Sequence, residues 1–158
     1  MKSFVFLLSI LLAFSVASAE PIVVIVRHAE KAANDPKDPD LSRAGRERAQ
    51  TLARILKDAN ISAIFTTEFK RTQETAAPTS KMTGVAPTIV PGKDFAALAS
   101  KLREVKGNAL VVGHGNTIPD IVKALGVDTP VEIADDDYSE IFVVTLNGTP
   151  QLMRLHYP

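Results

Sequence analysis

Two histidines in this chain directly follow apolar segments, where their side chains could act together on an anion. Arg27 and His28 follow the apolar segment 22–26. His114 comes two residues after a second apolar segment, 109–112. An arginine binds a phosphate-like anion through paired hydrogen bonds and keeps its charge, while a neutral imidazole is a nucleophile near pH 7. This combination predicts chemistry on a tetrahedral oxyanion, with phosphate as the first candidate.

A third basic side chain, Arg71, follows a shorter apolar segment at 61–65. In open α/β sheets, ligands bind beyond the carboxyl ends of the parallel strands. If the three apolar segments are neighbouring strands, the polar groups that follow them face one pocket. These groups are Arg27, His28, Arg71 and His114.

The chain alternates between patterns typical of strands and patterns typical of helices. The segments 22–26 and 109–112 are apolar without interruption, as in strands that helices cover on both faces. Pro78 is expected to kink or end the helix in which it lies. We expect strands at 22–26, 61–65, 88–90, 109–112, 140–146 and 151–156, and helices at 43–56, 71–82, 95–105 and 118–125.

This order of elements predicts an α/β fold. Alternating strands and helices form a three-layer α/β/α sandwich around a mostly parallel central sheet. The last two strands flank Asn147-Gly148, a pair favoured in tight hairpin turns, so the C-terminal element is expected to be antiparallel.

Composition narrows the classes of function. The chain has 158 residues, of which 46% are hydrophobic, which suits a single globular domain. Its 18 basic and 18 acidic residues balance, so we expect no nucleic-acid partner. With no cysteine, the chain has no disulfide, thiolate nucleophile or cysteine-bound metal.

The first 19 residues have the pattern of a secretory signal. Lys2 precedes an apolar stretch at 4–16, and Ala17-Ser18-Ala19 has the small residues at which signal peptidases cleave. We expect 1–19 to be removed, leaving one domain at 20–158 that is periplasmic or secreted and free of the membrane. The alternative is an uncleaved anchor, although the apolar stretch is shorter than the roughly 20 residues that a spanning helix needs.

Several motifs occur together and in order along most of the remaining chain. Together they resemble the histidine phosphatase superfamily, which has the phosphoglycerate mutase-like fold, and in particular its small bacterial members of branch 1. The motifs are Arg27-His28-Ala29-Glu30, Asn34, Leu41-Ser42-Arg43-Ala44-Gly45, the stretch from Thr66 to Thr75 around Arg71, and Gly113-His114-Gly115-Asn116.

The resemblance implies a role for each matching residue. His28 would attack phosphorus and become transiently phosphorylated. Arg27, Arg71 and His114 would hold the phosphoryl oxygens, and Asn34 stands where related enzymes place a further phosphate contact. The implied substrate is small and phosphorylated, and the reaction needs neither metal nor cofactor.

The resemblance does not assign the proton donor. Related enzymes place a glutamate in an insertion that this chain lacks. Glu30, two residues after His28, and Asp94, at the start of a predicted helix, are the two candidates. The expected function is an exported phosphatase for phosphate monoesters. The alternatives are a noncatalytic phosphate-binding protein and, less favoured, a phosphohistidine phosphatase or a mutase.

Other polar residues are interpreted as structural. A metal site built from His28, Glu30 and His114 would have too few further ligands. The run Asp135–Asp137 is expected to be a solvated loop, and His156 is expected to have a surface or packing role.

Overall fold

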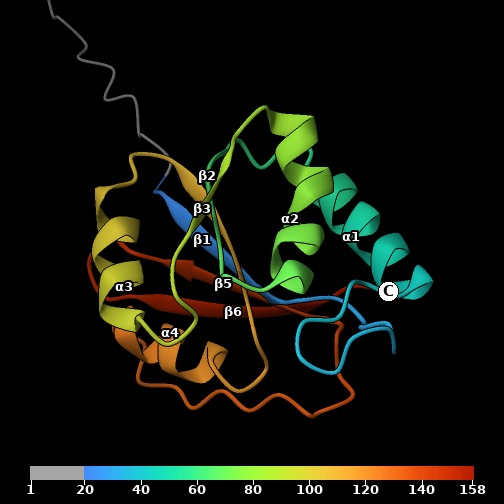
Figure 1. The fold of residues 1–158 in the computed structure, drawn as a ribbon. Helices are drawn as coiled ribbons and strands as arrows, with labels where there is room; N and C mark the ends of the chain where they lie inside the picture. Colours follow the sequence, from blue (N-terminus) through green and yellow to red (C-terminus); the bar gives the residue numbers. More distant parts are fainter. Residues whose placement is uncertain (1–19) are drawn as a thin grey trace, which may run out of the picture.

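The computed structural model describes residues 20–158, so the predicted signal at 1–19 lies outside the described residues. Within this range, every helix is too short or too polar to span a bilayer. The elements follow one another as the hydrophobic pattern predicts (Figure 1). They are β1 (Ile22–Arg27), α1 (Arg43–Ile55), β2 (Ile61–Thr66), α2 (Lys70–Thr83), β3 (Pro87–Ile89), α3 (Phe95–Glu104), β4 (Asn108–Gly113), α4 (Ile118–Ala124), β5 (Glu140–Thr145) and β6 (Gln151–His156).

The six strands form one sheet in the order β3-β2-β4-β1-β5-β6. β1 pairs in parallel with β4, β4 with β2, and β2 with β3. β5 and β6 are antiparallel, and β6 forms the edge next to the C-terminus. The predicted fold class is therefore confirmed. Because β1 and β4 are adjacent and parallel, the residues that follow them lie at the same edge of the sheet.

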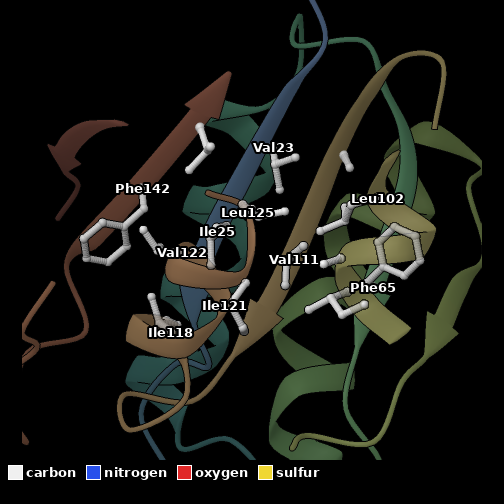
Figure 2. Close-up of a cluster of buried hydrophobic side chains, with 14 of the residues drawn as sticks. Val23, Ile25, Phe65, Leu102, Val111, Ile118, Ile121, Val122, Leu125 and Phe142 are labelled. Carbon is white, nitrogen blue, oxygen red and sulfur yellow. The ribbon is translucent and has the colours of Figure 1, made fainter. Parts of the chain in front are cut away.

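Helices cover both faces of this sheet: α1 and α2 lie on one side, and α3 and α4 on the other (Figure 1). Side chains of β1 alternate between the two resulting cores, as the period of a strand requires. Val23 and Ile25 pack with the apolar face of α4, as Figure 2 shows, whereas Val24 and Val26 pack on the α1 side. Burial on both faces explains the continuous apolar sequence of β1.

Helix α1 begins close to the end of β1 because its first residues fit that loop. The Ser42 hydroxyl accepts a hydrogen bond from Gly45 N at 3.0 Å and so caps the helix. Gly45 lies directly against the backbone of Glu30, where a β-carbon would collide with the Glu30 carbonyl oxygen. The absence of a side chain at Gly45 therefore lets α1 support the loop that carries His28.

Pro78 was expected to kink or end its helix, and it does not end it. Helix α2 continues to Thr83, although proline removes one backbone donor. Thr75, Ala76 and Thr79 are buried on either side of Pro78. Burial of this helix face against the rest of the domain outweighs the loss of one intrahelical hydrogen bond.

Candidate active site

His28 lies where β1 ends, and two hydrogen bonds fix its position. Its backbone N–H donates to Gly113 O at 2.9 Å, which joins it to the end of β4. Its ring atom Nδ1 is 2.9 Å from Ala29 O. Because a carbonyl oxygen can only accept, Nδ1 carries the hydrogen and Nε2 keeps its lone pair. The buried ring is therefore held in the tautomer that presents Nε2 as a nucleophile.

Thr75 of α2 forms a hydrogen bond with the same loop. Its hydroxyl oxygen accepts a hydrogen bond from Ala29 N at 2.9 Å and donates to Arg71 O at 2.7 Å. The side chain is fully buried. Thr75 thus connects the loop of the predicted nucleophile to the helix that carries Arg71. From the sequence Thr75 is expected only to lie on a helix surface or in packing; its spacing of one helical turn from Arg71 could have suggested this contact.

His114 follows β4 and faces His28, with ring centroids 5.3 Å apart. Its Nδ1 is 3.4 Å from Arg71 Nη2, and its Nε2 is 3.0 Å from Thr67 Oγ1. A guanidinium can only donate, so Nδ1 is the acceptor and Nε2 donates to Thr67. Both histidines that the sequence places at strand ends therefore share one site with Arg71.

The two arginines are held by aromatic rings, while some of their donors stay uncommitted. Arg27 stacks on Tyr138, with its guanidinium carbon 4.1 Å from the ring centroid, and Arg71 stacks on Phe69 at 4.3 Å. Within residues 20–158, the buried Nε atoms of both arginines have no hydrogen-bond partner. Uncommitted donors on two fixed cations are well suited to an oxyanion.

Burial and positive charge keep both imidazoles neutral. Burial is the main reason that the pKa of His28 falls from its ordinary 6.5 to about 3, and the nearby cations lower it further. The pKa of His114 falls to about 4 for the same reasons, although the carboxylate of Glu68 acts in the opposite direction. The lone pair of His28 is therefore available well below pH 7.

A hollow of about 350 Å³ opens beside His114. Its walls bring Arg71 and His114 together with Lys93, Glu68 and Asn116. A larger open hollow of about 870 Å³ lies between α1 and α2, but its lining includes neither of the two histidines nor Arg27 or Arg71. The smaller hollow is therefore the one that adjoins this site, since Arg71 and His114 line it.

Glu30 does not suit the role of proton donor. Its carboxylate forms an ion pair with Arg48, 2.8 Å from Nη2, and two further hydrogen bonds with Arg48 Nε. Burial alone would raise the pKa of Glu30, but Arg48 lowers it overall. A carboxylate held in this way stays ionised and lines a separate hollow with residues of α1.

Asp94 and Asn34 are also engaged elsewhere. Asp94 caps α3, since its carboxylate accepts a hydrogen bond from Ala97 N at 3.0 Å. The amide of Asn34 donates to the Asp40 carboxylate at 2.7 Å, and Asp40 N donates back to Asn34 at 3.3 Å. The structure therefore does not bring Asn34 to the histidines. Instead, Asn34 stabilises the loop in which it lies.

Other residues of the site were not found from the sequence. Glu68 lines the hollow beside His114, and its Oε2 accepts a hydrogen bond from Gly92 N at 2.9 Å. Tyr138 lies beside both Arg27 and His28, 6.1 Å from the latter between ring centroids. Glu68 lies three residues before Arg71, a spacing that could have suggested it. Tyr138 comes from a distant loop without a motif.

Comparison with known proteins finds a family pattern in the sequence and a shared fold. The model of the histidine phosphatase superfamily (branch 1) matches residues 23–92, which contain Arg27, His28 and Arg71. Residues 23–92 thus have the sequence pattern of a branch 1 histidine phosphatase. The sequence match ends before His114, but structural similarity to phosphatases of this superfamily extends over most of the domain.

Solved structures of these phosphatases share the fold. The protein histidine phosphatase SixA in complex with tungstate has a TM-score of 0.71 and 20% identity, covering 85% of this chain and 96% of its own. The alpha-ribazole phosphatase from Shigella flexneri has a TM-score of 0.68 and 16% identity, covering 86% and 96%. A mycobacterial glucosyl-3-phosphoglycerate phosphatase has a TM-score of 0.65 and 13% identity, covering 87% and 99%. A search of curated protein sequences gave no significant match.

Proposed function

We propose that this protein is an exported phosphatase that hydrolyses small phosphate monoesters through a phosphohistidine on His28, without a metal in the reaction. The observation that carries the proposal is the pairing of two neutral imidazoles with two fixed guanidinium groups at one edge of the sheet. This arrangement supplies both a nucleophile and an oxyanion site.

In the first step, Nε2 of His28 attacks phosphorus and the bond to the leaving oxygen breaks. The hydrogen bond from Nδ1 to Ala29 O keeps the ring oriented and stabilises the imidazolium that forms. In the second step, water attacks the phosphohistidine, phosphate leaves, and His28 returns to its neutral form.

Arg27, Arg71 and His114 stabilise the charge on the phosphoryl oxygens. The uncommitted donors of the arginines are in place before substrate binds, so little reorganisation is needed. The arriving anion reverses the local charge and raises the pKa of His114, whose Nδ1 then takes a proton and donates to the phosphoryl group. Removing one such donor typically lowers turnover by two to three orders of magnitude, or about 3–4 kcal/mol.

We assign proton donation to Glu68. It is a carboxyl group in the wall of the hollow that holds Arg71 and His114, and no arginine or lysine pairs with it within residues 20–158. In the first step Glu68 gives its proton to the leaving oxygen. In the second step its carboxylate takes a proton from the attacking water, which restores the acid.

The leaving group of the substrate would occupy the same hollow. A volume of about 350 Å³ suits a small organic group, and Lys93 offers a charge for a second anionic substituent. The similarity to SixA, a protein histidine phosphatase, favours phosphohistidine as a second candidate substrate. The signal pattern at 1–19 supports export and so favours small phosphate esters.

The test is hydrolysis of p-nitrophenyl phosphate by chelator-treated protein and by the His28→Ala variant. We expect turnover by the wild type alone, with both proteins unfolding at similar urea concentrations. A His28→Ala variant that keeps its activity would contradict the mechanism. Tight phosphate binding without turnover of this ester or of a phosphohistidine peptide would favour the noncatalytic alternative.

A further inference from the structure

The antiparallel pairing of β5 and β6 brings together three metal-binding side chains outside the phosphatase site. Glu140 and His156 are directly paired across these strands, so their side chains lie on the same face. Asp137 precedes β5 by three residues. One ligand atom from each of the three residues lies within 4.8 Å of the other two. The sequence gives no sign that the loop of Asp137 and the strand β6 are in contact. In the structure, their side chains form one cluster with Glu140.

Among the three residues, Glu140 gives the strongest indication that a ligand binds at this cluster. It is only 7% exposed, and its Oε2 is buried with no hydrogen-bond partner in the described part of the chain. Arg154 Nε lies 3.4 Å from the other carboxylate oxygen, Oε1. A buried carboxylate is costly unless each oxygen has a partner. A cation bound between Glu140, Asp137 and His156 would supply the partner that Oε2 lacks.

Ser139 already holds two of these side chains in place. Its hydroxyl group is 2.7 Å from Asp137 Oδ1 and 3.1 Å from His156 Nδ1. Such outer contacts orient metal ligands and are a regular part of protein metal sites. Ser139 therefore keeps Asp137 and His156 close together, so these two side chains need to move only slightly to bind an ion.

We propose that Asp137, Glu140 and His156 bind a divalent transition-metal ion of the zinc type. Zinc binds imidazole nitrogen and carboxylate oxygen, and its open sites have three protein ligands with water as the fourth. Calcium prefers six to eight oxygen ligands and magnesium six, which this cluster does not offer. Zinc–ligand bonds of about 2.0–2.2 Å require the three side chains to close slightly around the ion.

This ion would stabilise the loop that orients Arg27. Arg27 Nη1 donates to Ala134 O at 3.0 Å and to Asp137 O at 2.9 Å, and Tyr138 stacks on the same guanidinium. Binding at Asp137 fixes this loop to β5 and β6. The ion acts on the position of Arg27 and takes no part in phosphoryl transfer.

The test is equilibrium dialysis of untagged, chelator-stripped protein against Zn²⁺, since a polyhistidine tag binds the same ions. We expect one Zn²⁺ per chain. The substitutions Glu140→Gln and His156→Gln should weaken binding by at least about 10-fold, because loss of even an outer contact costs that much. The control is Asp136→Asn, which removes a neighbouring exposed carboxylate outside the cluster and should bind like the wild type.

The proposal is wrong if the wild type binds no Zn²⁺ in a defined ratio, or if both substitutions leave binding unchanged. Binding of Ca²⁺ in place of Zn²⁺ would also overturn it, because the imidazole would then have no role. His156 is exposed, so its substitution leaves the core intact. Since dialysis measures the ion directly, this result is independent of whether the protein is an active phosphatase.

Discussion

The imidazole rings of His28 and His114 meet edge to face, with centroids 5.3 Å apart and planes inclined by 65°. One ring donates through Nδ1 to a carbonyl oxygen, and the other donates through Nε2 to Thr67. Neither ring can take a second proton without placing a charge next to Arg71. The pair is thus neutral before an anion binds, which leaves His28 nucleophilic.

Stability should fall as pH falls below the ordinary histidine pKa. The folded-state pKa values of about 3 for His28 and about 4 for His114 lie below the unfolded value of 6.5. Between these pH values the unfolded chain binds more protons than the folded protein does. The contribution of the two histidines to the free energy of unfolding is therefore fully present above pH 6.5 and is lost as pH drops. At pH 4.5 the loss is at most about 2–3 kcal/mol per histidine.

Urea unfolding at pH 7 and pH 4.5 checks this prediction. The free energy of unfolding should fall less in a His114→Asn variant, which titrates one histidine fewer. Tungstate should reduce the loss in the wild type, because a bound oxyanion stabilises protonated imidazole. An equal loss in the wild type and the variant would show that other groups cause the pH dependence.

Replacing Glu68 should matter most for substrates with poor leaving groups. A proton donor lowers the barrier chiefly when the leaving oxygen is basic. We expect Glu68→Gln to lower kcat about 10²–10⁴-fold for an alkyl phosphate and much less for p-nitrophenyl phosphate. Rates for a series of phosphate esters, plotted against the leaving-group pKa, measure this dependence.

The same series for Glu30→Gln and Asp94→Asn provides the comparison. Glu30 is paired with Arg48 and Asp94 caps α3, so neither substitution should steepen the dependence on the leaving group. If the rate of either variant depends more steeply on the leaving-group pKa while that of Glu68→Gln is unchanged, the residue replaced in that variant is the proton donor instead.

Thr75→Val should weaken both folding and catalysis. Valine keeps the shape of threonine but leaves the buried Ala29 N–H without its acceptor, which costs about 1–3 kcal/mol. Because Ala29 O holds the ring of His28, kcat should fall while KM changes little. Urea unfolding and steady-state kinetics measure the two effects.

The matched control is Thr51→Val in α1, where a half-buried threonine donates to Glu47 O through a solvent-exposed hydrogen bond. This variant should resemble the wild type in both measurements. If Thr75→Val also behaves like the wild type, Thr75 has no part in positioning the nucleophile.

The sequence predicts the fold and the four central side chains because both depend on local patterns. Uninterrupted apolar strands identify β1 and β4, and the polar residues directly after them must share one sheet edge. The roles of Glu30 and Asn34 are not predictable in this way. Arg48 of α1 forms an ion pair with Glu30, and Asp40 accepts a hydrogen bond from Asn34. Only the packed structure shows these contacts.

Contacts between distant segments explain the other differences. Tyr138 reaches Arg27 from a loop more than 100 residues further along the chain. Glu140 meets His156 only through the register of β5 and β6. Pro78 stays inside α2 because the helix is buried on both sides of it. None of these depends on a periodic pattern in the sequence.

The most direct test of the central claim is to trap the phosphoenzyme. Protein mixed with excess substrate for a few milliseconds and quenched in alkali should carry one phosphoryl group, which peptide mass spectrometry should locate on His28. The His28→Ala variant should carry none. Turnover by the wild type with no phosphorylated histidine at any time point, or a phosphoryl group on another residue, would contradict the account.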